Sequence, residues 1–538
     1  MSVTTESPTA LAAWHELAEP VLRKTGRSLA TLSTTTDDGL TIAPLYVDGP
    51  TTPEVNPAPG PWDVRQYHGP GSDLADEING GTTSIWLPSG LGDDATRAVV
   101  ESGLGLVLDA GAETEQAADD LFRLLRHART PLRGNLGADP LGLAARTGAE
   151  PRTDLLTRLA RRCVDEHPPL RAITVDAAAH HDAGAPDALE LAYALATGVA
   201  YLRVLTDAGL CLRTALDQLE FRYAVGCDQW PAIAKLRAAQ LLWARVARAA
   251  GVTAPVRQRR HAVTSRTMMT ARAPWTNIIR STVAAFAAVV GGADAITVLP
   301  HDLCRGLATP EARRLARNTH ALLRLEVDAC RVQDPAAGSW YAEQLTRDLA
   351  TEAWARFRDI ERNGGMAASL ADGTVRTELA AARQRRRDDV RALRRPIVGV
   401  TAYPSLDEEP PPEVTPGRAA EEFEHLRRRA EAGPLKPVAL VLLDSPDAAA
   451  DAAETDRTLQ LAGVRTVRGT AEIAFLCGLD AAAPAHAEQT AERLRRSGTS
   501  LWALTAPSAT VPLDGRLHRG GDAVAALDRL LDQMGAPR

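Results

Sequence analysis

The chain has 538 residues, and because a single compact core rarely holds more than about 250–300 residues, we expect at least two domains. Hydrophobic residues make up 45% and charged residues 24% of the chain, a globular balance that excludes a mainly disordered or fibrous protein. The net charge of −7 provides no basic field, so we expect no nucleic-acid partner.

The N-terminal region, residues 1–60, is predicted to hold a short helix and an extended segment. Apolar residues recur three and four positions apart between Leu11 and Leu22, which is the spacing of one helix face. This helix either packs on its own domain or forms an arm that grips a partner. Residues 48–61 are rich in proline, glycine and threonine, which predicts an extended connection.

Residues 61–400 alternate between short apolar runs and long helical patterns, which predicts βαβ units and a parallel sheet. Seven or eight such units favour a closed (β/α)8 TIM barrel over an open sheet. The predicted strands are Ser84–Leu87, Leu104–Leu108, Ala172–Val175, Phe221–Val225, His261–Thr264 and Ala295–Leu299. The predicted helices are Glu115–Ala128, Asp187–Ala208, Trp230–Ala249, Trp275–Val290, Ala342–Asn363 and Val375–Leu393.

The last part of the chain is predicted to be a linker, residues 401–437, and a small domain, residues 438–538. The linker holds an acidic and proline-rich run and then an arginine-rich helix, Ala419–Ala430, which we expect to bury little surface. The small domain alternates short strands with helices, which predicts a flavodoxin-like, doubly wound α/β fold. Its predicted strands are Val438–Leu443, Val464–Val467, Ile473–Cys477 and Leu501–Leu504.

The cysteines and the apolar runs indicate where the protein resides. The six cysteines are scattered without the spacing of a zinc site, which is typical of buried thiols in a reducing compartment. The N-terminus lacks the apolar core of a signal peptide, and the longest apolar run, 283–290, is far shorter than the roughly 20 residues that span a bilayer. We therefore expect a soluble cytoplasmic protein.

The chain carries no phosphate loop, GxSxG, HExxH or GxGxxG motif, so histidines are the remaining candidates for chemistry. His180 and His181 follow a predicted strand, and barrel active sites lie where strands end. Two adjacent imidazoles could serve as acid and base, or one could be solvated while the other bonds a loop carbonyl. His261 begins another predicted strand and is equally compatible with a structural role.

The stretch RTMMTARAPWTNIIRSTVAAFAAVVGGADAITVLPHD, Arg266–Asp302, resembles the barrel of the methylmalonyl-CoA mutase family. Further similar blocks follow in family order: PWDVRQYHG at Pro61–Gly69, RRLARNTH at Arg313–His320, DPAAGSWYAE at Asp334–Glu343 and NGGM at Asn363–Met366. The resemblance covers residues 11–400 and continues more weakly to the end. Within the family, Val175–Leu210 and the GNLGADPLG stretch are similar to the small, β-type chain that pairs with a large catalytic chain.

The resemblance also shows where this barrel departs from catalytic chains. Alignment on the Ala183-Gly184 pair places Ala179 where catalytic chains carry the histidine that contacts the thioester carbonyl, and a methyl group cannot form a hydrogen bond. His180 and His181 are shifted from that position by one and two residues. Tyr67 matches a tyrosine that lies between substrate and corrin in catalytic chains, and His261 matches a family histidine. These four side chains remain weak catalytic candidates.

The small domain resembles a cobalamin-binding domain that has lost its motif. Catalytic chains bind cobalamin through DxHxxG, whose histidine ligates cobalt, but here Pro446 replaces the histidine and Ala449 the glycine. Asp444 and the Gly520-Gly521 pair are the remaining vestiges. Because proline cannot ligate a metal, the resemblance implies no cofactor and no metal in this chain, with adenosylcobalamin in the partner.

We therefore predict a non-catalytic small subunit of an adenosylcobalamin-dependent methylmalonyl-CoA mutase, paired as a heterodimer with a large catalytic subunit. One alternative is a diverged stand-alone acyl-CoA isomerase that works without cobalamin through His180, His181 or Tyr67. Another is an acyl-CoA-binding protein that has lost catalysis. A barrel filled by bulky apolar side chains would favour the subunit, because a pantetheine arm could not thread it; an open barrel lined by small polar side chains would favour the alternatives.

Overall fold

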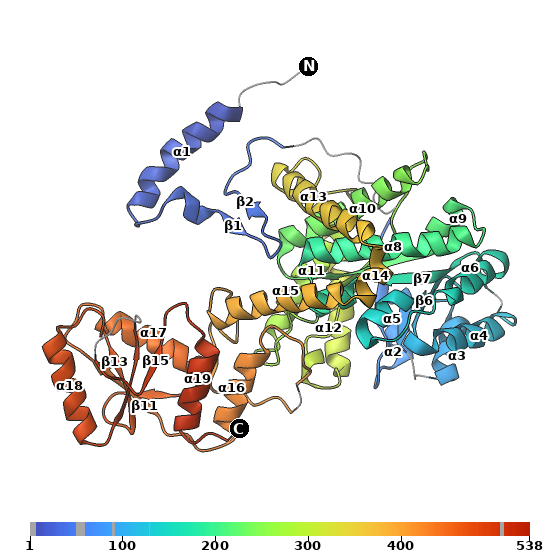
Figure 1. Cartoon of the computed structure of the whole chain (residues 1–538). Coiled ribbons are helices and arrows are strands. Elements are labelled where there is room, and N and C mark those ends of the chain that lie inside the picture. The colour runs from blue at the N-terminus through green and yellow to red at the C-terminus, as the bar shows by residue number, and fades with distance from the viewer. Residues whose placement is uncertain are drawn as a thin grey trace. The chain divides into compact units, whose positions relative to one another are not determined.

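The computed structural model describes residues 7–49, 60–88, 92–128, 130–412, 414–505 and 511–537 (Figure 1). The chain folds into two compact units. The first comprises the described parts of Met1–Ser265, Ile278–Pro300 and Leu307–Arg383. The second comprises those of Arg266–Asn277, His301–Gly306 and Gln384–Arg538. This division differs from the predicted domain boundaries, because two segments that follow barrel strands belong to the second unit.

Eight parallel strands form a closed barrel in the order β10-β3-β4-β5-β6-β7-β8-β9, which confirms the predicted TIM barrel. Two of these strands, β3 and β6, are not apolar runs: β3 reads DVRQY and β6 reads GNLGA, so neither was recognised from hydropathy. The strands are β3 Asp63–Tyr67, β4 Ser84–Pro88, β5 Gly105–Asp109, β6 Gly134–Ala138, β7 Leu170–Asp176, β8 Leu219–Val225, β9 Arg260–Thr264 and β10 Ala295–Thr297.

Helices alternate with the barrel strands and follow the last of them. They are α2 Leu74–Asn79, α3 Gly92–Ser102, α4 Thr114–Leu125, α5 Pro140–Thr147, α6 Asp154–Glu166, α7 Ala178–Asp182, α8 Asp187–Asp207, α9 Leu212–Asp217, α10 Gln229–Ala249, α11 Thr276–Val290, α12 Pro310–Ala321, α13 Trp340–Arg362, α14 Gly365–Ala371 and α15 Thr374–Arg391. Helix α8 is long and apolar enough to cross a membrane, but 78% of its apolar window is buried inside the protein, as in the core helix of a globular fold.

Two glycines shape strand β6, whose pairing with β7 shifts register between Asn135 and Ala138. Gly134 and Gly137 have φ angles of +151° and +72°. A Cβ atom would lie 1.7 Å from the Leu106 carbonyl oxygen at the first position and 1.9 Å from that of Leu108 at the second. Since both obstacles are backbone atoms of β5, only glycine lets β6 approach its neighbour here.

The second unit contains a five-stranded parallel sheet in the order β12-β11-β13-β14-β15, which is the flavodoxin-like order that the sequence predicts. The short strand β15 was not predicted. Helix α18 packs on one face of the sheet, and α16, α17 and α19 contribute to the core on the other. The elements are α16 Glu421–Glu431, β11 Val438–Leu442, α17 Ala448–Leu461, β12 Thr466–Val467, β13 Ile473–Cys477, α18 Pro484–Arg496, β14 Ser500–Leu504, β15 Gly515–Leu517 and α19 Ala523–Gln533.

The expectation that residues 401–437 bury little surface is wrong. Helix α16 carries an apolar stripe, Phe423, Leu426 and Ala430, that is buried in the core of the second unit. Glu424 on the same helix is 1% exposed and accepts the N–H groups of Ala271 and Arg272 at 2.6 and 3.1 Å. The arginine-rich sequence of this helix suggests exposure. Arginine side chains can nevertheless pack their aliphatic stems on apolar surface, so they are compatible with a buried helix.

The N-terminal region of the first unit contains the predicted helix, α1 Ser7–Arg23, and a small hairpin, β1 Thr34–Thr35 with β2 Thr41–Ile42. Asp38 in the hairpin accepts the N–H of Ala188 at 3.0 Å, at the first turn of α8. Among the described side chains of α1, none is buried, and Leu17 is 75% exposed. The predicted extended connection falls largely on residues 50–59, outside the described residues.

We predict that Gly137→Ala destabilises the chain by about 2–4 kcal/mol, because the new methyl group meets a carbonyl oxygen that cannot move away. Chemical unfolding followed by circular dichroism measures the loss. Gly226→Ala is the matched control, since a Cβ at Gly226 meets no atom within 4 Å. Equal stability of the two variants would refute the role of the β6 backbone.

Candidate functional site

An arginine lies at the centre of the barrel, at the end where the strands terminate. Arg222 on β8 places Nη1 3.0 Å from Asp109 Oδ2 and 3.3 Å from Asp176 Oδ2. The two aspartates are the last residues of β5 and β7, so the arginine reaches across the mouth of the barrel. Its side chain is only 3% exposed. Buried charges in this arrangement neutralise one another.

Aromatic side chains pack around this arginine. The Arg222 guanidinium lies 4.0 Å from the ring centroid of Trp86, on the diametrically opposite strand β4. Trp86 also donates from Nε1 to Asp109 at 3.1 Å. Tyr67 packs edge-on against Trp86 with a centroid distance of 5.0 Å. The candidate Tyr67 is therefore a neighbour of the ion-pair cluster.

His261 joins the same cluster from β9. Arg222 Nε lies 3.4 Å from Nδ1 of His261. The other ring nitrogen of His261, Nε2, lies 2.8 Å from the Thr297 hydroxyl. Burial lowers the pKa of His261 well below its usual range, and the positive charges of Arg65 and Arg222 lower it further. The ring is therefore neutral: Nδ1 accepts from the arginine and Nε2 donates to the threonine. Both ring nitrogens are engaged by protein groups.

A second arginine crosses the barrel closer to its floor. Arg65 on β3 pairs with Glu220 on β8 at 2.5 Å and with Asp63 at 3.1 Å. Its Nε donates to the Ser84 hydroxyl at 3.1 Å. The side chains of Arg65 and Glu220 are 6% and 8% exposed. Together with Arg222, this pair places large, oppositely charged side chains in the interior of the barrel.

One cavity at the mouth of the barrel is small. This cavity, beside Arg222, has a volume of about 10 Å³, which is room for about one water molecule. It is lined by Asp109, Gly111, Thr114, Gly137, Asp139, Arg146, Thr174, Asp176 and Arg222. Small-molecule sites commonly measure roughly 300–1,000 Å³, so this cavity is too small to receive an acyl thioester.

The neighbouring histidines of α7 have different surroundings. His180 is 4% exposed and packs on Tyr193 with a centroid distance of 5.0 Å. Burial lowers its pKa to about 4, so the ring is neutral near pH 7. His181 instead places Nε2 2.8 Å from the Ser265 hydroxyl. The structure thus does not bring the two rings to a shared site, and Ala179 on the same helix is half-buried.

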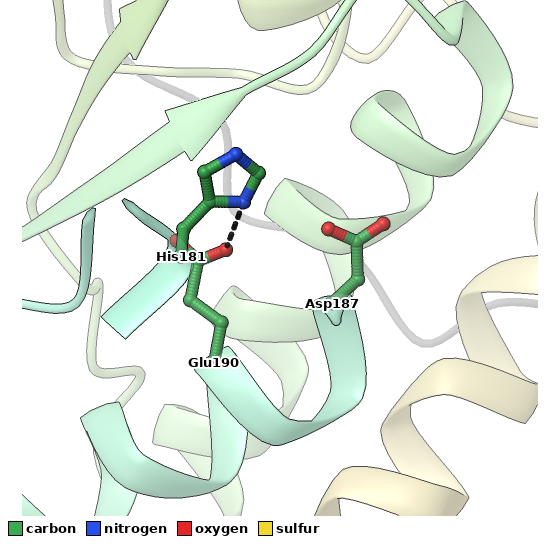
Figure 2. A group of neighbouring side chains, drawn as sticks. All are labelled: His181, Asp187 and Glu190. Carbon is green, nitrogen blue, oxygen red and sulfur yellow. Dashed lines mark ion pairs between the residues drawn. The ribbon is translucent and has the colours of Figure 1, made fainter. Parts of the chain in front are cut away.

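His181, Asp187 and Glu190 form a cluster whose ligand atoms lie within 4.8 Å of one another (Figure 2). The Lys235 ammonium lies 2.8 Å from Asp187 Oδ1 and 2.8 Å from Glu190 Oε2. Burial alone would lower the pKa of Lys235, but the two carboxylates raise it above its ordinary value. The lysine supplies the positive charge that a metal ion would bring, so this cluster does not fit a metal.

If the second unit bound cobalamin, the residues at the carboxyl edge of its sheet would have to accommodate it. Pro446 lies between β11 and α17, which begins at Ala448, so the proline lies outside the helix. Gly478, with φ +82°, donates its N–H to Asp451 at 2.7 Å. A Cβ at this glycine would lie 2.8 Å from the Ala448 Cα. The end of β13 and the start of α17 are therefore closely packed.

Arg519 closes the same edge, next to the Gly520-Gly521 pair. It forms ion pairs with Asp451, with Glu454 at 3.0 Å and with Asp480 at 3.6 Å. These groups are engaged with one another, and the ligand position is a proline. The described residues at this edge do not fit base-off cobalamin.

The fold defines a two-unit α/β protein. One unit is a closed parallel barrel with ion pairs at its mouth, and the other is a flavodoxin-like unit. A family model described as methylmalonyl-CoA mutase matches residues 127–433. The methylmalonyl-CoA mutase small subunit of Streptomyces virginiae is 40% identical over 97% of this chain and 96% of its own length. That of Propionibacterium freudenreichii subsp. shermanii is 33% identical over 95% and 91%. The chain belongs to the methylmalonyl-CoA mutase family, as its motifs predicted.

Large subunits of the family match less of the chain. The methylmalonyl-CoA mutase large subunit of Propionibacterium freudenreichii subsp. shermanii is 36% identical over 46% of this chain and 34% of its own length. That of Porphyromonas gingivalis is 34% identical over 45% and 34%. Similarity along the full chain is thus found with proteins named small subunits.

Sequence analysis missed the charged residues that define the site. Arg222 and Glu220 lie within β8, LEFRYAV, where they alternate with apolar residues. This alternation is the signal of a strand whose polar side chains share one face. It was overlooked because the run was selected for its apolar content. Lys235 was equally visible, as one of very few lysines in the chain.

We predict that Arg222→Met destabilises the chain by about 3–5 kcal/mol, since two buried carboxylates lose their counter-ion. Arg123→Met is the control, because Arg123 pairs with Asp120 at a site where its side chain is 57% exposed, and such a change costs under about 1 kcal/mol. Thermal unfolding of the two variants measures the difference. A stability loss no greater than that of the control would contradict the central role of Arg222.

Because His180 is buried and neutral, we predict that the free energy of unfolding decreases in acid. Its pKa is about 4 in the folded chain and about 6.5 when unfolded. Between these values the unfolded state binds a proton that the folded state refuses, so the stability falls as pH drops from 6.5 to 4, by roughly 3 kcal/mol in total. In His180→Phe this component should disappear, which unfolding titrations at pH 7, 6 and 5 measure. An unchanged pH slope would show that His180 titrates normally.

Proposed function

We propose that this chain is the non-catalytic small subunit of an adenosylcobalamin-dependent methylmalonyl-CoA mutase, paired with a large subunit that carries the cofactor. The filled barrel interior is the observation that supports this most. Arg65 and Arg222 cross it with their carboxylate partners, and the cavity beside Arg222 is about 10 Å³. A pantetheine arm would have to displace buried ion pairs, which is costly. In this proposal the partner interconverts methylmalonyl-CoA and succinyl-CoA.

The bulky side chains in the barrel interior are not the apolar ones that the sequence-based prediction named. Bulky charged and aromatic side chains, Arg65, Arg222 and Trp86, take the place of the bulky apolar ones that would favour a subunit. The consequence for a ligand is the same, because volume excludes the pantetheine arm whatever the polarity. Charged filling adds a penalty, since opening the barrel would leave carboxylates without partners.

The two alternative functions both need an accessible acyl-CoA site. A stand-alone isomerase would act through Tyr67, His180 or His181, but Tyr67 packs on Trp86 and His180 is buried and neutral. An acyl-CoA-binding protein would need a channel where Arg65 and Arg222 lie. These placements support the subunit over either alternative.

The proposed pairing rests on the relatives and on helix α1. Relatives named small subunits match the full chain, and a name of that kind implies a larger companion. Helix α1 exposes Leu17 and Val21 by 75% and 64%, which suits a segment whose apolar face is covered by a partner. We place the pair in the cytoplasm, without a membrane or nucleic-acid partner.

The pairing predicts activity only in the complex. The chain purified alone should not interconvert methylmalonyl-CoA and succinyl-CoA, whereas the chain co-expressed with the large subunit of its host should co-elute with it as an active complex. Removal of residues 1–27 should weaken co-elution while the barrel stays folded, because no barrel strand is lost. Full-length chain that never co-elutes with any mutase large subunit would reject the pairing.

The chain alone should also fail to bind cobalamin. Titration with adenosylcobalamin should leave the absorption spectrum unchanged, and Pro446→His should not produce a base-off spectrum, because Arg519 and the Gly478–Ala448 contact still close the edge. The large subunit in the same assay is the positive control. A base-off spectrum at micromolar cofactor with the unmodified chain would contradict the assignment.

A further inference from the structure

One buried arginine outside the barrel interior has few partners. Arg260 begins β9, points away from His261 and the barrel axis, and is 0% exposed. Its Nη1 donates to the carbonyl oxygens of Leu236 on α10 at 2.8 Å and of Gly291 at 3.1 Å. Among the described residues, its Nε and Nη2 have no hydrogen-bond partner. Three N–H groups of a cation are thus buried without an acceptor among the described residues.

Two other arginines buried in this unit have carboxylate partners. Arg65 pairs with Glu220, and Arg237 pairs with Glu343 at 2.9 Å. Near Arg260 in the sheet, the Asp294 carboxylate accepts the Arg260 backbone N–H and pairs with the Arg257 guanidinium. The guanidinium therefore retains an unneutralised charge. Burial and the positive charges of Arg257 and Arg237 lower the pKa of Arg260 to about 9, still above neutral pH.

A second orphaned group lies in the same layer, between the barrel wall and α10. Gln258, two residues before Arg260, is 0% exposed and bonds the Tyr223 hydroxyl through its amide at 3.1 Å, and its Oε1 has no partner among the described residues. Amide oxygen and nitrogen are interchangeable in such an assignment. With the amide turned over, the Tyr223 hydroxyl donates to Oε1, and the Gln258 amide N–H₂ becomes a further donor without a partner.

From these groups we infer that Arg260 and Gln258 hold a small monovalent anion, of the size and charge of chloride, between β9 and helices α10 and α11. The anion accepts the N–H groups of Arg260 Nε and Nη2 and the amide N–H₂ of Gln258. The anion neutralises the guanidinium charge and gives each of these donors an acceptor. Gly292 keeps the site open, because a Cβ there would lie 3.3 Å from Arg260 Nη2.

An anion explains this site better than a water molecule does. A water would accept at most two of the available N–H groups, and Gln258 Oε1, in the orientation that the structure has, would receive only one of its two protons. It would also leave the charge of Arg260 buried among two other arginines, which is expensive in a medium of low dielectric. With the Gln258 amide turned over, the donor set is cationic and lacks acceptors, which is the composition of an anion site.

The binding of chloride to the folded chain predicts that chloride stabilises it specifically. At constant ionic strength, replacing gluconate by about 100 mM chloride should raise the unfolding temperature of the full chain by about 2 °C. Arg260→Met, which keeps the length of the side chain but removes the charge, should abolish this rise. Arg259→Met is the matched control, because Arg259 is the exposed neighbour, and this variant should keep the rise.

Crystals grown in bromide test the site even if Arg260→Met does not fold. An anomalous bromide peak within hydrogen-bonding distance of Arg260 Nε or Nη2 would support the assignment. A water in that place without an anomalous peak, or a chloride effect of equal size in Arg260→Met, would overturn it. Neither readout depends on mutase activity or on the large subunit.

Discussion

The barrel depends on ion pairs between charged side chains that are buried in its interior. Arg222 reaches from β8 to the carboxylates that end β5 and β7, and Arg65 reaches from β3 to Glu220. A buried charge is tolerated only beside its counter-charge, so each arginine fixes the position of several strands at once. The same interactions thus hold the barrel together and close it.

The second unit closes its carboxyl edge by the same means. Arg519 pairs with three carboxylates there, and Glu424 receives two backbone N–H groups and the Arg418 guanidinium. In both units, positions where related folds admit ligands are held by groups of the chain itself. Lys235 repeats the pattern, since its ammonium lies between carboxylates that could otherwise hold a cation.

The alternation of apolar runs and helical patterns predicted both folds, because buried parallel strands are apolar and spaced by helices. It failed where a strand serves the barrel interior: DVRQY in β3 is polar since Arg65 faces the axis, and GNLGA in β6 is selected for backbone approach. The helix that became α16 was predicted, but its burial was not, because its apolar stripe consists of only three residues, Phe423, Leu426 and Ala430. Motifs located Tyr67 and His261, but only the folded strands bring Arg222, Asp109 and Asp176 together, because such contacts depend on barrel closure.

The division of the chain has a consequence for how it is synthesised. The polypeptide passes between the two units five times, at 265/266, 277/278, 300/301, 306/307 and 383/384. The second unit therefore takes its first residues from the middle of the barrel sequence and its last from the C-terminus. It cannot be completed until the ribosome has released almost the whole chain, and no single proteolytic cut separates the units into two contiguous pieces. During translation, the segments 266–277 and 301–306 are therefore synthesised before most of the second unit, to which they belong.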